Sequence, residues 1–249
     1  MSHRIVSLGV VLVLLMGTWH VADAGELSAK QILEASDRAR GNVQGLVWKV
    51  RIINTEQGEE AQNMLISLSA KENNSLAKFI APSRIKGQLM LVRDRNMWFI
   101  KPGVSKPVAI SPRQKLTGGA ANGDIASTNY ALDYIPQILG EESINNEMCY
   151  TIELVAANKN VTYDKIKYWV SKSRLVGTRA EFYTVSGKVF KEAIFEYGNT
   201  IRSNDKTLPF LSKMIITDST TKNTTTLSYS EVQTKDLPAS TFNLNTLVH

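Results

Sequence analysis

Histidine and cysteine are scarce in this chain, and their scarcity excludes several kinds of catalytic and metal site. The three histidines are His3, His20 and His249, so none lies between residues 21 and 248. Ser-His-Asp and Cys-His catalytic arrangements and histidine-ligated zinc sites therefore have no internal histidine to use. The only cysteine, Cys149, has no partner for an internal disulfide, and we expect it to be a buried structural thiol.

Other sequence signals of chemistry are missing as well. There is no Gly-x-Ser-x-Gly nucleophile motif, and the glycine-rich stretch 118–123 lacks the Gly-Lys-Ser/Thr ending of a phosphate-binding loop. The adjacent carboxylates at 59–60 and 141–142 would serve acid–base catalysis only if they faced one cleft, and a solvated surface is the alternative. We therefore expect a protein that is not an enzyme and that has no cofactor and no metal.

The formal net charge of +6 is spread along the chain, without a dense basic block that also contains aromatic residues. Nucleic acid is therefore not expected as a partner. A mild attraction to anionic lipid head groups would follow from this charge, but an ordinary solvated surface has the same charge.

The first residues have the layout of a secretory signal peptide. Arg4 precedes an apolar run at 5–16, and the small-x-small site Ala22-Asp23-Ala24 follows. This run is shorter than the roughly 20 apolar residues that span a bilayer, which argues against the alternative of a membrane anchor. We expect cleavage after Ala24, a periplasmic location, and a single domain at 25–249.

The rest of the sequence predicts a mainly β protein of the α+β class. Apolar residues alternate with polar ones in short segments at 46–110 and again at 148–231, which is typical of a meandering antiparallel sheet. We expect about ten to eleven strands. One amphipathic helix is predicted at 28–40, capped by Ser28. A second is predicted to be capped by Asp124, and Pro136 is predicted to kink or end it.

Several predicted strands are apolar on both faces, which is unusual for an antiparallel sheet. In the stretch NMWFI at 96–100, alternation places Met97 and Phe99 on one face and Trp98 and Ile100 on the other. A strongly curved sheet covered by helices would explain this pattern. A sheet that encloses an apolar cavity for acyl chains would explain it equally well.

Four ordered stretches resemble the outer-membrane lipoprotein-sorting family, whose members have the LolA/LolB-like fold of periplasmic lipoprotein and lipid carriers. The first stretch contains Pro-x-x-x-Lys-Gly and Trp-x-x-x-Pro. The second contains Arg-Gln-x-Leu-Thr-Gly, then Asn-Gly-Asp-Ile-Ala, then Asn-Tyr-Ala-x-Asp-Tyr. The stretches follow one another along the chain at 79–110, 111–134, 165–197 and 237–247.

This resemblance implies an incomplete antiparallel β-barrel, with helices packed as a lid on the concave side. Its apolar interior would hold acyl chains of a lipoprotein or another lipid, which the protein would shuttle between envelope membranes. An inner-membrane exporter, an outer-membrane acceptor, or both are the expected partners of a monomeric carrier. The alternative is a non-catalytic scaffold or accessory subunit of an envelope lipid-export complex.

Candidate lipid-binding residues follow from the resemblance together with the alternation, and the alternative for each is a permanently packed core position. They are Trp48, Val50, Ile66, Leu68, Phe79, Leu89, Leu91, Trp98, Ile100, Tyr168 and Val170. Arg93, Arg95 and Arg113 are candidate head-group ligands because a guanidinium group suits phosphate, although each would equally suit a solvated surface.

Overall fold

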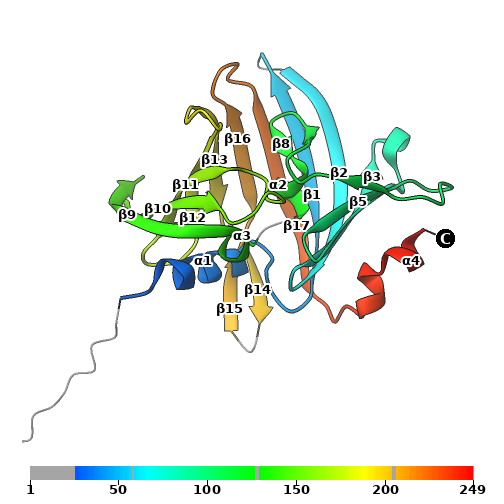
Figure 1. Ribbon diagram of the computed structural model, residues 1–249, viewed down its shortest axis with the longest axis horizontal. Helices are drawn as coiled ribbons and strands as arrows, with labels where there is room; N and C mark the ends of the chain where they lie inside the picture. The colour runs from blue at the N-terminus through cyan, green and yellow to red at the C-terminus, as the bar shows by residue number, and fades with distance from the viewer. Residues whose placement is uncertain (1–25, 58, 127–128, 204–205, 249) are drawn as a thin grey trace, which may run out of the picture.

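A curved antiparallel sheet dominates the structure (Figure 1), a computed structural model that describes residues 26–57, 59–126, 129–203 and 206–248. The expected signal peptide lies outside these residues. In the described chain the sheet has 13 strands. In spatial order they are β6 (Val108–Ile110), β5 (Asn96–Ile100), β4 (Leu89–Arg93), β3 (Asn74–Ala81), β2 (Glu59–Lys71), β1 (Leu46–Glu56), β17 (Thr224–Thr234), β16 (Lys213–Asp218), β13 (Val189–Glu196), β12 (Gly177–Tyr183), β11 (Lys165–Ser171), β10 (Glu147–Ala156) and β9 (Tyr134–Ile144).

The prediction of a mainly β, antiparallel and unclosed sheet is confirmed, but the predicted strand number was too low. Two small sheets accompany the main one, β7 (Lys115–Thr117) with β8 (Ala120–Ala121) and β14 (Asn199–Ser203) with β15 (Lys206–Phe210). β7 and β8, with three and two residues, are too short to leave a periodic signal in the sequence. The main sheet also gains β9, where the sequence predicted the end of a helix.

The prediction of one helix from Asp124 to Pro136 is wrong. The structure has two short helices there, α2 (Asn122–Ala126) and α3 (Tyr130–Asp133), and the chain then enters β9. The side chain of Asn129 caps α3 by accepting a hydrogen bond from the backbone N–H of Leu132. Pro136 lies in β9, at the edge of the sheet, where a missing N–H costs no ladder hydrogen bond.

The first predicted helix is confirmed as α1 (Ala29–Arg38). Ser28 and Gln31 form a reciprocal capping box at its start. Beyond its end, Gly41 adopts a φ of +116°, which favours glycine. Ile32 and Leu33 of α1 are fully buried against the concave face of the sheet.

The two faces of the sheet are covered by different parts of the chain. In Figure 1, α1, α2 and α3 lie across the hollow of the sheet, and their apolar side chains belong to the main core cluster. The C-terminal segment, with the 3₁₀ helix η2 (Ala239–Phe242) and α4 (Leu244–Leu247), lies outside the hollow near β3 and β5. Its residues Leu237 and Phe242 form a second, smaller cluster on the convex face. Strands β4 and β5 are apolar on both sides because both faces are covered.

A buried carboxyl group holds α1 against α3. Asp37 is fully buried, and one of its carboxyl oxygens accepts a 2.8 Å hydrogen bond from the backbone N–H of Ala131. Next to it, the hydroxyl groups of Ser36 and Tyr168 are 2.8 Å apart. The buried guanidinium of Arg40 lies over the ring of Tyr130, 4.1 Å from its centroid.

This site predicts a pH dependence of stability. Burial raises the pKa of the Asp37 carboxyl from 3.8 to about 7, although the charge of Arg40 opposes the shift. The folded state therefore binds this proton more tightly than the unfolded state, and the resulting stability is lost as pH rises from 3.8 through about 7. In urea denaturation across this range, we expect the free energy of unfolding to fall relative to that of Asp37→Asn, which does not titrate. If the free energy of unfolding changed with pH in the same way for the two proteins, Asp37 would not be the source of the pH dependence.

Candidate functional site

An open cavity of about 650 Å³ lies on the concave face, beside strands β2 to β5. We call it the β2–β5 cavity. One side is formed by the strands and by the 3₁₀ helix η1 (Ser83–Ile85), and the other side by β7 and the start of α2. Its lining residues are Gln62, Met64, Phe79, Arg84, Ile85, Gln88, Met90, Phe99, Ile110, Gln114, Lys115, Leu116, Thr117 and Asn122.

The floor of the β2–β5 cavity is apolar because inward-facing residues of neighbouring strands meet there. Met90 pairs with Phe99 across β4 and β5, and Phe79 lies on the same face of β3. The rings of Phe79 and Phe99 pack edge to face with centroids 6.1 Å apart. Met64 and Met90 add flexible, polarisable side chains that adapt to ligands of different shape.

A second open cavity, of about 480 Å³, lies on the other side of the β7–β8 hairpin. We call it the β12–β13 cavity because Tyr183, Phe190 and Lys191 contribute to its wall. Lys115 of β7 lines both cavities. The hairpin at 115–121 therefore separates two hollows of the concave face.

A buried ion pair anchors this hairpin to the sheet. The ammonium of Lys191 on β13 lies 2.9 Å from a carboxylate oxygen of Asp124 in α2, and both side chains are almost fully buried. Lys191 also donates to the carbonyl oxygen of Gly119 at 2.9 Å. Tyr163 donates its hydroxyl proton to the same carboxylate at 2.7 Å. Asp124 also accepts a 2.8 Å hydrogen bond from the backbone N–H of Ala121 at the start of α2, so it is the centre of a polar cluster as well as a local helix-start acceptor.

A second set of hydrogen bonds fixes the near side of the hairpin. The amide nitrogen of Asn54 donates to the hydroxyl of Thr117 at 2.6 Å, and Thr117 donates to Gln62 at 2.7 Å. The backbone N–H of Gly119 donates to the hydroxyl of Thr225 at 2.8 Å. The hairpin is therefore tied to β1, β2, β13 and β17.

Eleven candidate lipid-binding residues were predicted, and the structure divides them between the two faces of the sheet. Seven belong to the main concave cluster: Trp48, Val50, Ile66, Leu68, Phe79, Tyr168 and Val170. Of these, Phe79 lines the β2–β5 cavity, and Trp48 and Leu68 line a void of about 40 Å³. The other four belong to the convex cluster under the C-terminal segment: Leu89, Leu91, Trp98 and Ile100.

The placement of these four on the concave face is therefore corrected. Alternation separates Leu89 and Leu91 from Met90, but it does not say which set faces the hollow. The structure puts Met90, Phe99, Met64, Ile85, Ile110 and Leu116 in the cavity wall instead. Met64 was detectable in the sequence because it is two residues from Ile66, on the same face of its strand.

The three candidate head-group arginines are engaged by other parts of the protein. Arg113 donates two hydrogen bonds, of 2.9 and 2.8 Å, to the carboxylate of Asp164. Arg95 donates to the carbonyl oxygen of Leu132 at 3.0 Å, and Arg93 lies 3.4 Å from the Asp94 carboxylate.

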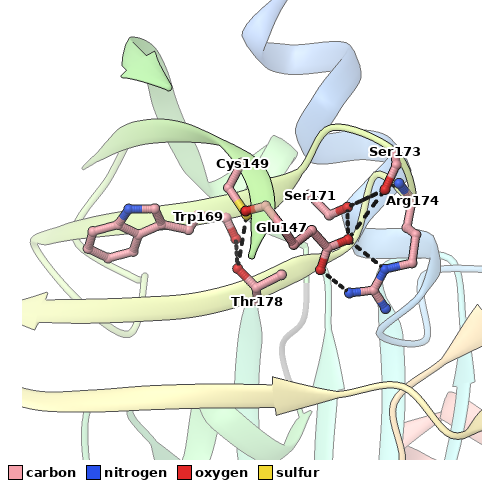
Figure 2. A network of polar contacts seen from close by, with 7 residues as sticks. All are labelled: Glu147, Cys149, Trp169, Ser171, Ser173, Arg174 and Thr178. Carbon is pink, nitrogen blue, oxygen red and sulfur yellow. Dashed lines mark hydrogen bonds and ion pairs between the residues drawn. The ribbon is translucent and has the colours of Figure 1, made fainter. Parts of the chain in front are cut away.

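The polar network around Cys149 does not form an activated nucleophile (Figure 2). The thiol is buried, as predicted, and burial raises its pKa. Its hydrogen-bond partners are the carbonyl oxygen of Glu147 and the hydroxyl of Thr178, both at 3.5 Å. Hydrogen bonds from Arg174 lower the pKa of the Glu147 carboxyl to about 2, so this group is an acceptor and not a base at neutral pH.

The adjacent carboxylates Glu141 and Glu142 do not face one cleft. They follow one another in β9, so their side chains point to opposite faces of the sheet. Glu141 pairs with Lys172, while Glu142 accepts hydrogen bonds from the indole of Trp169 at 2.9 Å and from Lys167 at 3.2 Å. This arrangement lacks the geometry of paired acid–base catalysts.

Comparison with known proteins shows the family. A family model described as an uncharacterized protein matches residues 71–249. The crystal structure of a LolA superfamily protein from Nitrosomonas europaea is 33% identical in sequence, with a TM-score of 0.78, over 88% of this chain and 98% of that chain. The chain belongs to the LolA superfamily. The resemblance found in the sequence is thereby confirmed.

Two further solved structures share the LolA-like fold at lower identity. An outer membrane lipoprotein-sorting protein domain from Vibrio parahaemolyticus has a TM-score of 0.74 at 22% identity, over 89% of this chain and 98% of that chain. A DUF1329 family protein from Desulfovibrio piger also has a TM-score of 0.74, at 18% identity, over 88% of this chain and 97% of that chain. A search of curated proteins gave no match.

None of the helices in the described part of this LolA superfamily member is both long enough and apolar enough to cross a membrane.

Proposed function

We propose that this protein is a periplasmic carrier that binds lipid acyl chains in the β2–β5 cavity and shuttles them between envelope membranes. The observation that carries the proposal is an open cavity of about 650 Å³ with a floor of Met64, Phe79, Met90 and Phe99. Ligand pockets have volumes of roughly 300–1,000 Å³ and predominantly apolar walls. Each buried CH₂ group of an acyl chain would contribute about 0.8 kcal/mol.

Membership of the LolA superfamily and the signal-peptide layout of the first residues support this proposal. The proposal takes 25–249 as one carrier domain and needs no covalent chemistry. Of the eleven candidate residues, we propose that Phe79 contacts the lipid directly and that Trp48, Val50, Ile66, Leu68, Tyr168 and Val170 support the cavity from the core.

Native mass spectrometry of the mature protein, released from its own envelope without detergent, tests the proposal. We expect a protein–lipid adduct, with the lipid recovered by solvent extraction. A clean apoprotein mass under these gentle conditions would contradict the carrier function.

A charged residue in the cavity floor should abolish lipid loading. In Met64→Glu, an acyl chain would have to desolvate a carboxylate, which costs several kcal/mol, so we expect at least about a tenfold loss of bound lipid. Leu65→Glu is the matched control, because Leu65 is the next residue of β2, is also half-buried, and points to the opposite face. Equal loading of the two variants in the same native mass spectra would place the lipid elsewhere.

A scaffold role in an envelope lipid-export complex is the second candidate, favoured by exposed apolar side chains at the β9 edge. Ile135 and Leu139 of β9 are 63% and 51% exposed, and Met148 of the neighbouring strand β10 is 51% exposed. Such side chains at an unpaired sheet edge suit contact with another protein. For a scaffold, the native mass spectrum would show a stoichiometric protein complex without lipid.

A further inference from the structure

We infer that the lipid bound in the β2–β5 cavity carries a negatively charged head group, which Arg84 and Lys115 hold at the rim. This inference rests on the proposed function and names the chemical class of its substrate. Both residues are exposed and line the cavity, Arg84 from η1 and Lys115 from β7 on the other side. Among the described lining residues there is no aspartate and no glutamate.

The positive charges at this rim have no carboxylate partner among the residues that the structure describes. Within the described part of the chain, Arg84 makes no ion pair and no side-chain hydrogen bond. Lys115 likewise has no carboxylate within ion-pair distance among the described residues, and it acts on Asp218 only through a weaker long-range attraction. A desolvated anion between the two side chains would therefore meet cations that are free to bind it.

The β12–β13 cavity differs in its charges and serves as an internal comparison. It shares Lys115, but its other two cations are paired, Arg113 with both carboxylate oxygens of Asp164 and Lys191 with Asp124. Its lining also contains the carboxylates of Asp164 and Asp218. Elsewhere in the chain, Arg93 and Arg95 are also paired with carboxylates. Of the two cavities, only the β2–β5 cavity has a rim with unpaired positive charge and no carboxylate in the described lining.

Two glutamine side chains add hydrogen-bond donors to this rim. The carbonyl oxygen of Gln62 accepts hydrogen bonds from Asn54 and Thr117, and that of Gln114 accepts one from the backbone N–H of Ser111. With both oxygens occupied, the amide nitrogens are the groups left to bind a ligand. A rim of two cations and two amide N–H₂ groups matches the acceptor oxygens of a phosphate or carboxylate.

Binding of soluble short-chain lipids tests this inference. Because no vesicle is present, attraction of the protein to a charged membrane surface cannot contribute to the measured affinity. Dihexanoyl phosphatidylglycerol and dihexanoyl phosphatidylcholine, each below its micelle concentration, have the same chains and differ in net head-group charge. By isothermal titration calorimetry we expect the wild-type protein to bind the anionic lipid at least about tenfold more tightly, since hydrogen bonds to charged groups are the stronger kind. Glycerol 3-phosphate, which has the phosphate without chains, should bind far more weakly than either lipid.

The double variant Arg84→Gln/Lys115→Gln should lower the affinity for phosphatidylglycerol much more than that for phosphatidylcholine, so that the preference for the anionic lipid is lost. Lys101→Gln/Lys106→Gln removes the same charge from exposed positions outside the cavity lining and should keep the preference. Equal binding of both lipids by the wild type, or loss of preference in the control, would overturn the head-group inference but leave the carrier function standing. Failure of both lipids to bind, or tight binding of glycerol 3-phosphate alone, would instead overturn the proposed function.

Discussion

Replacing Lys191 with methionine is expected to destabilise the protein by about 3–5 kcal/mol, because it leaves a buried carboxylate without its cation. The ammonium of Lys191 makes the 2.9 Å ion pair with Asp124 and a 2.9 Å hydrogen bond to the carbonyl oxygen of Gly119. It also lies 4.5 Å from the ring centroid of Tyr163. Methionine has a similar length and apolar stem, so the loss would report on the charge rather than on a new void.

Urea denaturation with a double-mutant cycle separates this effect from simple loss of packing. In Lys191→Met/Asp124→Asn the uncompensated charge is gone, and we expect much of the lost stability to return. Lys213→Met is the control, because its pair with Glu196 has a similar distance of 3.0 Å but side chains that are 40% and 48% exposed. Exposed pairs contribute about 0–1 kcal/mol, so a Lys191→Met effect no larger than the control would contradict the anchoring role.

The same ion pair holds the hairpin between the two cavities, so the stability of the protein and the shape of the proposed lipid site depend on the same contact. The carbonyl oxygen of Gly119 and the carboxylate of Asp124 lie at the two ends of the β8 region, and Lys191 binds both. Removing Lys191 should therefore loosen the shared wall of the cavities as well as lower the free energy of unfolding.

The second large effect is expected from Gly45→Ala, which should destabilise the protein by roughly 2–4 kcal/mol through backbone strain and a steric clash. Gly45 has a φ of +97°, and a Cβ atom there would lie 2.2 Å from the carbonyl oxygen of Lys235. The backbone N–H of Lys235 also donates to the carbonyl oxygen of Gly45 at 3.2 Å. A clash with main-chain atoms cannot be relieved by rotating a side chain.

This clash lies where the C-terminal segment leaves the sheet, so its consequence should be local as well as global. Leu237 and Phe242 follow Lys235 and cover Leu91 and Ile100 on the convex face. We expect faster proteolysis of the C-terminal segment in Gly45→Ala, together with a lower urea midpoint. Gly187→Ala is the control for strain alone, because Gly187 has a φ of +80° and nothing within 4 Å of an added Cβ. Equal losses in the two variants would show that the contact with Lys235 is unimportant.

The sequence alone determined the features that depend on local chemistry. The capping box of Ser28 and Gln31 specifies the start of α1 through hydrogen bonds within four residues. Period-2 alternation specifies extended strands, and the lack of internal histidine removes whole classes of active site. The ordered motifs at 79–134 specify the LolA superfamily, as the comparison with the Nitrosomonas europaea protein confirms.

Only the tertiary structure decided which side of each two-sided strand faces the hollow. Met90 lines the cavity and Leu91 lies under the C-terminal segment, although the two are adjacent and similarly apolar. Phe242, which is far away in the sequence, belongs to the same convex cluster as Leu91. In the same way, the local sequence predicts Asp124 only as a helix cap, whereas the structure shows that it also forms an ion pair with Lys191 on a distant strand. Contacts of this kind join residues that are far apart in the sequence, so they produce no periodic pattern. Alternation shows that both faces of a strand are buried, but it does not show which segment covers each face.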